Sequence, residues 1–111
     1  MATNFKNVII NSVGTTPVRI YTTPENFNTT VIGMSLANLT AGIVTASVYL
    51  QDTPNDSATG YYIKDVSVAP NSSLRLVTSG EKLIIPEYNE LFIVSNTTAS
   101  LDVIMSYVEI A

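Results

Sequence analysis

The residue types that carry most catalytic and metal chemistry are missing from this chain of 111 residues, which contains no histidine and no cysteine. Histidine is the commonest general base and transition-metal ligand, while cysteine supplies thiolate nucleophiles, thiolate metal ligands and disulfides. Catalysis would therefore have to rely on carboxylates, hydroxyls, lysine or tyrosine. We expect the chain not to be an enzyme and to use no cofactor.

Two groups of acidic residues are the strongest remaining candidates for chemistry. The segment 51–57 (Gln-Asp-Thr-Pro-Asn-Asp-Ser) resembles a calcium loop in composition, but it lacks alternating ligands and a distal bidentate glutamate. Glu81, Glu87 and Glu90 could supply an acid and a base to a glycosidase, but the chain has no tryptophan to stack on a sugar. We interpret both groups as solvated loop carboxylates and expect no metal site.

A lysine and several tyrosines could also form a pocket or a contact surface. A serine and lysine nucleophile pair needs a buried lysine beside a serine, and nothing around Lys64 marks such a pair. Strand alternation predicts that Lys64 and Asp65 point to opposite faces, with Lys64 on the row of Val66 and Val68, which favours an edge or the end of a strand for Lys64. Tyrosine gives a large contact area at low entropy cost, although a position at the edge of the core is favoured for any single one. The six tyrosines are Tyr21, Tyr49, Tyr61, Tyr62, Tyr88 and Tyr107.

Composition excludes further classes of partner. Charged residues make up 13% of the chain, the net charge is -4, and the five lysines and arginines are scattered, so a phosphate-binding surface is not expected and nucleic acid is not a predicted ligand. The apolar patch Val8–Ile10 is far shorter than a signal peptide or a membrane span, so we expect folding in a cytosol and no membrane partner. Five Asn-x-Ser/Thr sequons are then interpreted as chance products of the composition, at Asn28, Asn38, Asn55, Asn71 and Asn96.

The segments that position these residues read as short strands. In Ile43–Gln51, apolar and polar residues alternate with a period of two, and in Thr29–Leu39 the inward residues are predicted to be Ile32, Met34 and Leu36. In Ser72–Thr78 the pattern turns Leu74 and Leu76 inward and Arg75 outward, and in Tyr61–Ala69 it puts Val66 and Val68 on one face. The last strand, Ser100–Ile110, has the predicted inner row Leu101, Val103, Met105 and Tyr107.

Four further segments complete eight or nine strands: Phe5–Val13, Pro17–Thr22, Glu81–Ile85 and Glu90–Asn96. Turn residues separate the segments, including a tight turn at 69–72 with Pro70 in its second position and a hairpin connection at 78–81. This is too many short strands for one open sheet, and no helix is predicted. The sequence therefore predicts an all-β fold, a two-layer antiparallel β-sandwich of which the jelly roll is one form, with residues 1–111 as a single domain.

The N-terminal residues 1–6 are expected to form a flexible arm. Chain ends with polar residues are often loose until a partner orders them. The arm is therefore a candidate docking segment, made up of Ala2, Thr3, Asn4, Phe5 and Lys6.

Four stretches of this sequence resemble small virion structural proteins of tailed bacteriophages: residues 31–38 (VIGMSLAN), 62–66 (YIKDV), 69–74 (APNSSL) and 103–110 (VIMSYVEI). The resemblance covers most of the chain from Thr29 onward. It is a pattern of strands and turns without an invariant site, so it assigns no functional residue. It implies a small β domain that is either a decoration or cement protein on the capsid or an accessory subunit of the neck, tail or fibre.

The leading hypothesis is an oligomeric virion protein, with a trimer or hexamer favoured, that stabilises the particle by contacts with itself and with other virion proteins such as the major capsid protein. Such a protein would be assembled in the cytoplasm of the host bacterium and would end up in the virion. The alternative is a receptor-binding or carbohydrate-binding β-sandwich that uses tyrosine and asparagine side chains in its loops. An enzyme is the least favoured of the three classes.

Overall fold

The chain forms nine β-strands in a computed structural model that describes residues 3–55, 58–77 and 82–111. All the predicted strands are confirmed, and within the described residues no helix is found, so none there could cross a membrane. The strands are β1 (Thr3–Val13), β2 (Val18–Thr22), β3 (Asn28–Asn38), β4 (Val44–Asp52), β5 (Ala58–Val68), β6 (Ser73–Leu76), β7 (Leu83–Ile85), β8 (Glu90–Ser95) and β9 (Leu101–Ile110).

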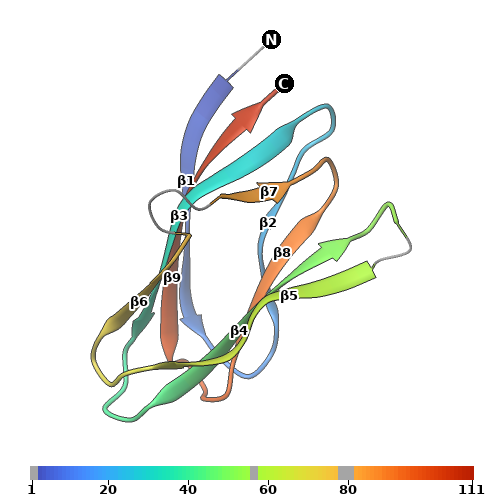
Figure 1. Ribbon diagram of the computed structural model, residues 1–111. Helices are drawn as coiled ribbons and strands as arrows, with labels where there is room; N and C mark the ends of the chain where they lie inside the picture. The colour runs from blue at the N-terminus through green and yellow to red at the C-terminus, as the bar shows by residue number, and fades with distance from the viewer. Residues whose placement is uncertain (1–2, 56–57, 78–81) are drawn as a thin grey trace.

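Two antiparallel sheets make up the predicted sandwich (Figure 1). One is five-stranded, in the order β1-β9-β3-β6, with β7 also paired to β3, and the other is four-stranded, in the order β2-β8-β4-β5. β7 pairs with Thr29–Val31 and β6 with Met34–Ala37, so the two short strands share one strand position beside β3. Counted in this way, both sheets have four positions. Consecutive strands alternate between the sheets except for β4 and β5, which are neighbours in the four-stranded sheet, and this is the strand order of a jelly roll.

The inner faces of both sheets supply the core. On β9 the predicted inner row is confirmed, since Leu101, Val103, Met105 and Tyr107 are all buried. On β4, Val44, Ala46 and Val48 are buried as the alternation predicts. Complete burial of an aliphatic side chain such as these stabilises the fold by about 1.5–3 kcal/mol.

A β-bulge in β3 overturns one prediction. The pairing with β9 shifts between Val31 and Gly33, so the extra residue Ile32 is half exposed and Val31 is buried in its place. Met34 and Leu36, beyond the bulge, point inward as predicted. A period-two pattern cannot show a bulge, because one inserted residue shifts every side chain before it to the other face.

A second bulge corrects the prediction for Lys64. Ile63 pairs with Val48 and Val66 with Ala46, so two residues of β5, Lys64 and Asp65, lie opposite Ser47. Asp65 has a positive φ of 49°, and the two exposed side chains form an ion pair at 3.6 Å. Lys64 therefore does not share the inward row of Val66 and Val68. The predicted edge position is confirmed, because β5 is an edge strand.

The N-terminal segment also differs from expectation. Thr3–Lys6 are not a loose arm but the first residues of β1, and Thr3 pairs with Ile110 of β9. The backbone pairing with β9 is what orders them. Ala2, the first residue of the predicted docking segment, lies outside the described residues.

The two predicted turns have different outcomes. The turn at 69–72 is confirmed: Pro70 occupies its second position, Asn71 has a positive φ of 52°, and the Ser72 hydroxyl donates to the Ala69 carbonyl at 2.8 Å. The predicted hairpin connection at 78–81 lies outside the described residues.

Candidate functional site

The outer face of the five-stranded sheet is unusually apolar. The register aligns its outward side chains in rows, with Ile9 beside Ile104 and Phe5 beside Val108. Phe5 is 77% exposed and Ile9 is 59% exposed, whereas apolar side chains of this size are ordinarily buried. We call this surface the apolar face; its large exposed residues are Phe5, Ile9, Ile32, Ile84, Ile104 and Ile110.

Few charges interrupt the apolar face. Among the described residues paired on its outward rows, the charged ones are Arg75, opposite Ser35, and Asp102, opposite Ala37. Asp102 is already engaged, because its carboxylate accepts the Ser12 N–H at 2.9 Å. A hollow of about 430 Å³, lined in part by Ile32, Arg75 and Ile104, gives the surface some relief. A clustered apolar surface of this kind is typical of a protein interaction site.

The outer face of the four-stranded sheet carries a different surface. Arg19, Phe92, Tyr49 and Tyr61 lie opposite one another on four adjacent strands, and we call them the aromatic row. The rings of Tyr49 and Phe92 are stacked with centroids 5.1 Å apart, and Tyr61 meets Tyr49 edge to face at 5.5 Å. The Lys64 ammonium lies 4.8 Å from the centroid of the Tyr61 ring. Several ring faces are therefore already occupied by neighbours within the chain.

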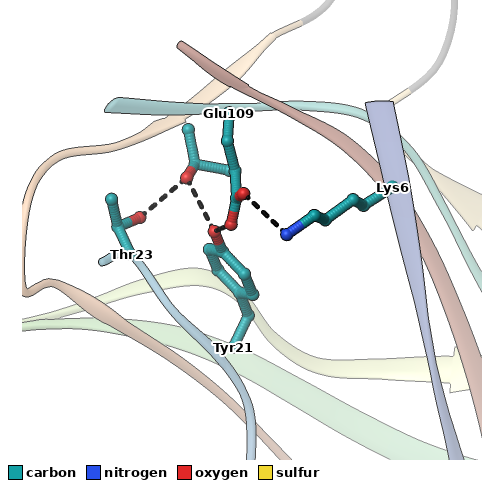
Figure 2. Close-up of polar contacts among 5 residues, drawn as sticks. Lys6, Tyr21, Thr23 and Glu109 are labelled. Atoms are coloured by element: carbon teal, nitrogen blue, oxygen red, sulfur yellow. Dashed lines mark hydrogen bonds and ion pairs between the residues drawn. The ribbon is translucent and has the colours of Figure 1, made fainter. Parts of the chain in front are cut away.

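A polar cluster joins the two sheets beneath the start of β1 (Figure 2). Glu109 of β9 is 3% exposed, and its carboxylate forms an ion pair with Lys6 of β1 at 3.1 Å. The Tyr21 hydroxyl, from β2 in the other sheet, donates to the same carboxylate and lies 3.0 Å from the Thr29 hydroxyl. Thr23 donates to Ile85 O at 2.8 Å. A buried charge is costly unless it is paired, and here the pairing ties three strands together.

Two tyrosines in this region have altered acidity. Burial, followed by the hydrogen bond to Glu109, raises the pKa of Tyr21 well above its ordinary value of 10.0. Burial and the nearby charge of Glu109 also raise the pKa of Tyr107, whose ring centroid lies 4.4 Å from that of Tyr21. Both phenols stay protonated at neutral pH, so the cluster holds a donor against a carboxylate and presents no activated nucleophile.

Of the acidic residues considered as catalytic, the two that the structure describes, Glu87 and Glu90, are each bound to other groups. Glu90 forms an ion pair with Arg19 at 3.2 Å and accepts the Thr53 hydroxyl at 2.9 Å. The Glu87 carboxylate accepts the backbone N–H of Asn26, and Glu81 lies outside the described residues. Each of the two described carboxylates is thus engaged with a neighbouring strand or loop. In the described part of the chain no three acidic side chains gather as metal ligands would, and Asp56 and Ser57 of the calcium-like loop fall outside it.

The sequon at Asn38 has a structural role. Asn38 is buried, and its amide donates to Gly42 O at 2.8 Å and to Val68 O at 3.0 Å. Its side-chain oxygen accepts the backbone N–H and the hydroxyl of Thr40. All of this holds the β3–β4 connection in place. A glycan could not be attached there without breaking these bonds.

The polar cluster was not predicted from the sequence, although the sequence does contain an indication of it. Glu109 continues the inner row of β9 two residues after Tyr107, and Lys6 precedes Val8 and Ile10 on the inner row of β1. A charged residue on an inner row implies a partner. The register of β1 against β9 sets Lys6 opposite Tyr107, and so within reach of Glu109 two residues further along β9.

A comparison with models of protein families finds no match, and a comparison with curated proteins finds none either. Solved structures do share the fold. One is a chain of Bacillus endospore appendages, described as disulfide-linked pili, with a TM-score of 0.55 and 14% identity over 96% of this chain and 86% of that one. Another is PirA, with a TM-score of 0.51 and 15% identity over 95% and 91%. At these identities, the likeness establishes the β-sandwich fold for this chain.

Proposed function

We propose that this chain is a structural protein without enzymatic activity, which binds a larger assembly through its apolar face. The observation that carries the proposal is the set of large aliphatic and aromatic side chains exposed on the outward rows of β1, β3, β7 and β9. Burying such side chains releases about 25 cal/mol for each Å² of apolar surface removed from water. Because the rows carry few charges, little desolvation cost opposes this gain.

The fold likeness supports this type of role. Of the two chains compared above, one comes from endospore appendages that are described as pili, which are polymers. Those pili are described as disulfide-linked, whereas this chain has no cysteine. Assembly here would therefore not use disulfides of this chain, and an apolar contact surface is a feature that can hold subunits together without them.

The finer assignment follows the resemblance to virion proteins of tailed bacteriophages. In that setting the chain is a decoration or cement protein that contacts the major capsid protein, is assembled in the host cytoplasm and resides in the virion. An accessory position in the neck, tail or fibre is the alternative location. The apolar face serves either location, because both require a surface that becomes buried on assembly.

Co-sedimentation with particles of the encoding virus that lack this chain tests the proposal. The wild-type chain is expected to pellet with the particles, and Ile104→Asp, which puts a charge in the middle of the apolar face, is expected to stay in the supernatant. Tyr61→Asp, an equal charge change on the opposite face, is the matched control and should bind like wild type. Failure of the wild-type chain to bind, or equal binding by all three chains, would refute the proposal.

The aromatic row supports a second candidate function, the binding of carbohydrate. Aromatic rings on a flat sheet face are one way to hold a sugar. Against it, Tyr49 and Phe92 cover each other and Lys64 lies over Tyr61. Binding on a glycan array that is lost in Tyr61→Ala would support this function, and absence of any array signal would remove it.

A further inference from the structure

We propose that the free edge of β1 pairs with β1 of a second copy of this chain, antiparallel and around a two-fold axis, so that two five-stranded sheets become one continuous sheet. The inference rests on the proposed structural function and names one of its partners. The juxtaposition behind it is an unprotected edge strand on which large apolar residues, Phe5 and Ile9, lie at equal distances on either side of Asn7.

The four sheet edges differ in how well they are protected against pairing. Folded proteins usually shorten edge strands or interrupt them with proline, bulges or charges. β6 and β7 are four and three residues long. β2 has five residues, follows Pro17 and is itself irregular between Arg19 and Tyr21. β5 is interrupted by the bulge at Lys64 and Asp65.

β1 lacks these protections. It has 11 residues and pairs regularly with β9 from Thr3 to Ile10, and its irregularity comes only at the end, between Ile10 and Val13. It contains no proline and a single charged residue, Lys6. That charge does not repel an incoming strand, because Lys6 forms an ion pair with the buried Glu109 of its own chain.

The outward face of β1 has an apolar-polar-apolar pattern that is symmetric about Asn7. Within the regular pairing with β9, its outward residues are Thr3, Phe5, Asn7 and Ile9. An axis through Asn7 places Phe5 of each copy opposite Ile9 of the other, with the two Asn7 amides facing each other.

The same axis keeps the two lysines apart, because Lys6 then faces Val8 and Asn4 faces Ile10 of the other copy. An axis through Lys6 would set two ammonium groups opposite each other, which is unfavourable.

The pairing would add to the apolar face. The regular part of β1 that is symmetric about Asn7, residues 4–10, forms an antiparallel ladder with on the order of six to eight new backbone hydrogen bonds. Phe5 and Ile9 of both copies meet along the seam, so the two apolar faces form one larger surface on the same side of the joined sheet. An even-numbered assembly built from such pairs follows, and a hexamer made of three pairs is compatible with it, whereas a trimer is not.

Replacing Asn7 by a charged residue tests the pairing of β1 with β1 of a second copy. Asn7 is exposed, so substitutions there leave the monomer intact. Asn7→Lys and Asn7→Glu each place like charges at the two-fold axis and are expected to weaken dimerisation about fivefold in sedimentation velocity. A mixture of the two variants should dimerise again. Ser67→Lys, on exposed β5, is the control and should behave as wild type. Equal dimerisation of all chains, or no dimer in the wild type, would overturn the inference.

A disulfide test fixes the register, because the chain has no cysteine of its own. In Asn7→Cys the two sulfurs face each other, and oxidation should give a covalent dimer. In Ser106→Cys, on β9 beside Asn7, the two residues lie three strand spacings apart, or about 14 Å, which is too far for a bridge. A bridge in the second variant but not in the first would refute the register.

These outcomes are separable from those of the particle assay. Particle binding by a chain that is monomeric in every test would end the pairing inference and leave the proposed function standing. If the chain dimerises through Asn7 but binds no particle, the pairing inference stands and the proposed function is refuted.

Discussion

Replacing Tyr21 by phenylalanine removes one hydroxyl from the polar cluster and should destabilise the fold. The ring and its contact with Tyr107 remain, whereas the bonds to Glu109 and Thr29 are lost. A hydrogen bond to a charged group contributes about 1.5–3 kcal/mol and a neutral one about 0.5–1.5 kcal/mol. Thr29 keeps the Thr23 hydroxyl 3.0 Å away as a hydrogen-bond partner, and Glu109 keeps its ion pair with Lys6. We therefore expect a loss of about 3 kcal/mol in the free energy of unfolding.

Urea denaturation followed by far-ultraviolet circular dichroism measures this loss. The matched control is Tyr61→Phe, which also removes one hydroxyl but from a half-exposed residue of the aromatic row, and it should cost less than about 0.5 kcal/mol. A Tyr21→Phe variant within about 0.5 kcal/mol of wild type would refute the reasoning. It would mean that the carboxylate of Glu109 is satisfied without the phenol.

Three other predictions concern stability. Above pH 10 an unfolded tyrosine loses its proton while folded Tyr21 keeps it, so the contribution of Tyr21 to the free energy of unfolding should fall by about 1.4 kcal/mol for each pH unit of rise. Urea unfolding of both chains between pH 8 and 12 should show a smaller slope in Tyr21→Phe than in wild type. Asn38→Ala removes the bonds to Gly42 O and Val68 O and should cost about 2–3 kcal/mol in the same assay at pH 7, and a cost under about 0.5 kcal/mol would contradict the assigned role. Leu36→Ala leaves a cavity in the core between the two sheets and should lower the free energy of unfolding by about 3 kcal/mol. The same change at the half-exposed Leu39, Leu39→Ala, should lower it by much less.

The strands were predictable because their periodicity is strong. The alternation in β9 and β4 identified the inner rows correctly, and the turn around Pro70 follows from the chemistry of proline and asparagine. The sequence failed where an extra residue interrupts the alternation. Ile32 and Lys64 were both assigned to the wrong side, because a bulge changes the pairing without changing the local composition.

The interaction surfaces needed the register as well as the pattern. Phe5 and Ile104 lie about a hundred residues apart, and only the pairing of β1 with β9 places them on one face. The expectation of a flexible N-terminal arm assigned Phe5 to a loose chain end, so the apolar face was not predicted. The polar cluster depends in addition on the packing of β2 in one sheet against β9 in the other, which no local pattern encodes.

Side-chain footprinting by hydroxyl radicals tests most directly whether the apolar face is the surface buried on assembly. The free chain and the particle-bound chain would be oxidised in parallel and analysed by mass spectrometry. We predict that Phe5 and Ile104 become protected on binding, while Tyr61 on the opposite face stays as reactive as in the free chain. Protection of Tyr61 with continued oxidation of Phe5 and Ile104 would contradict the account.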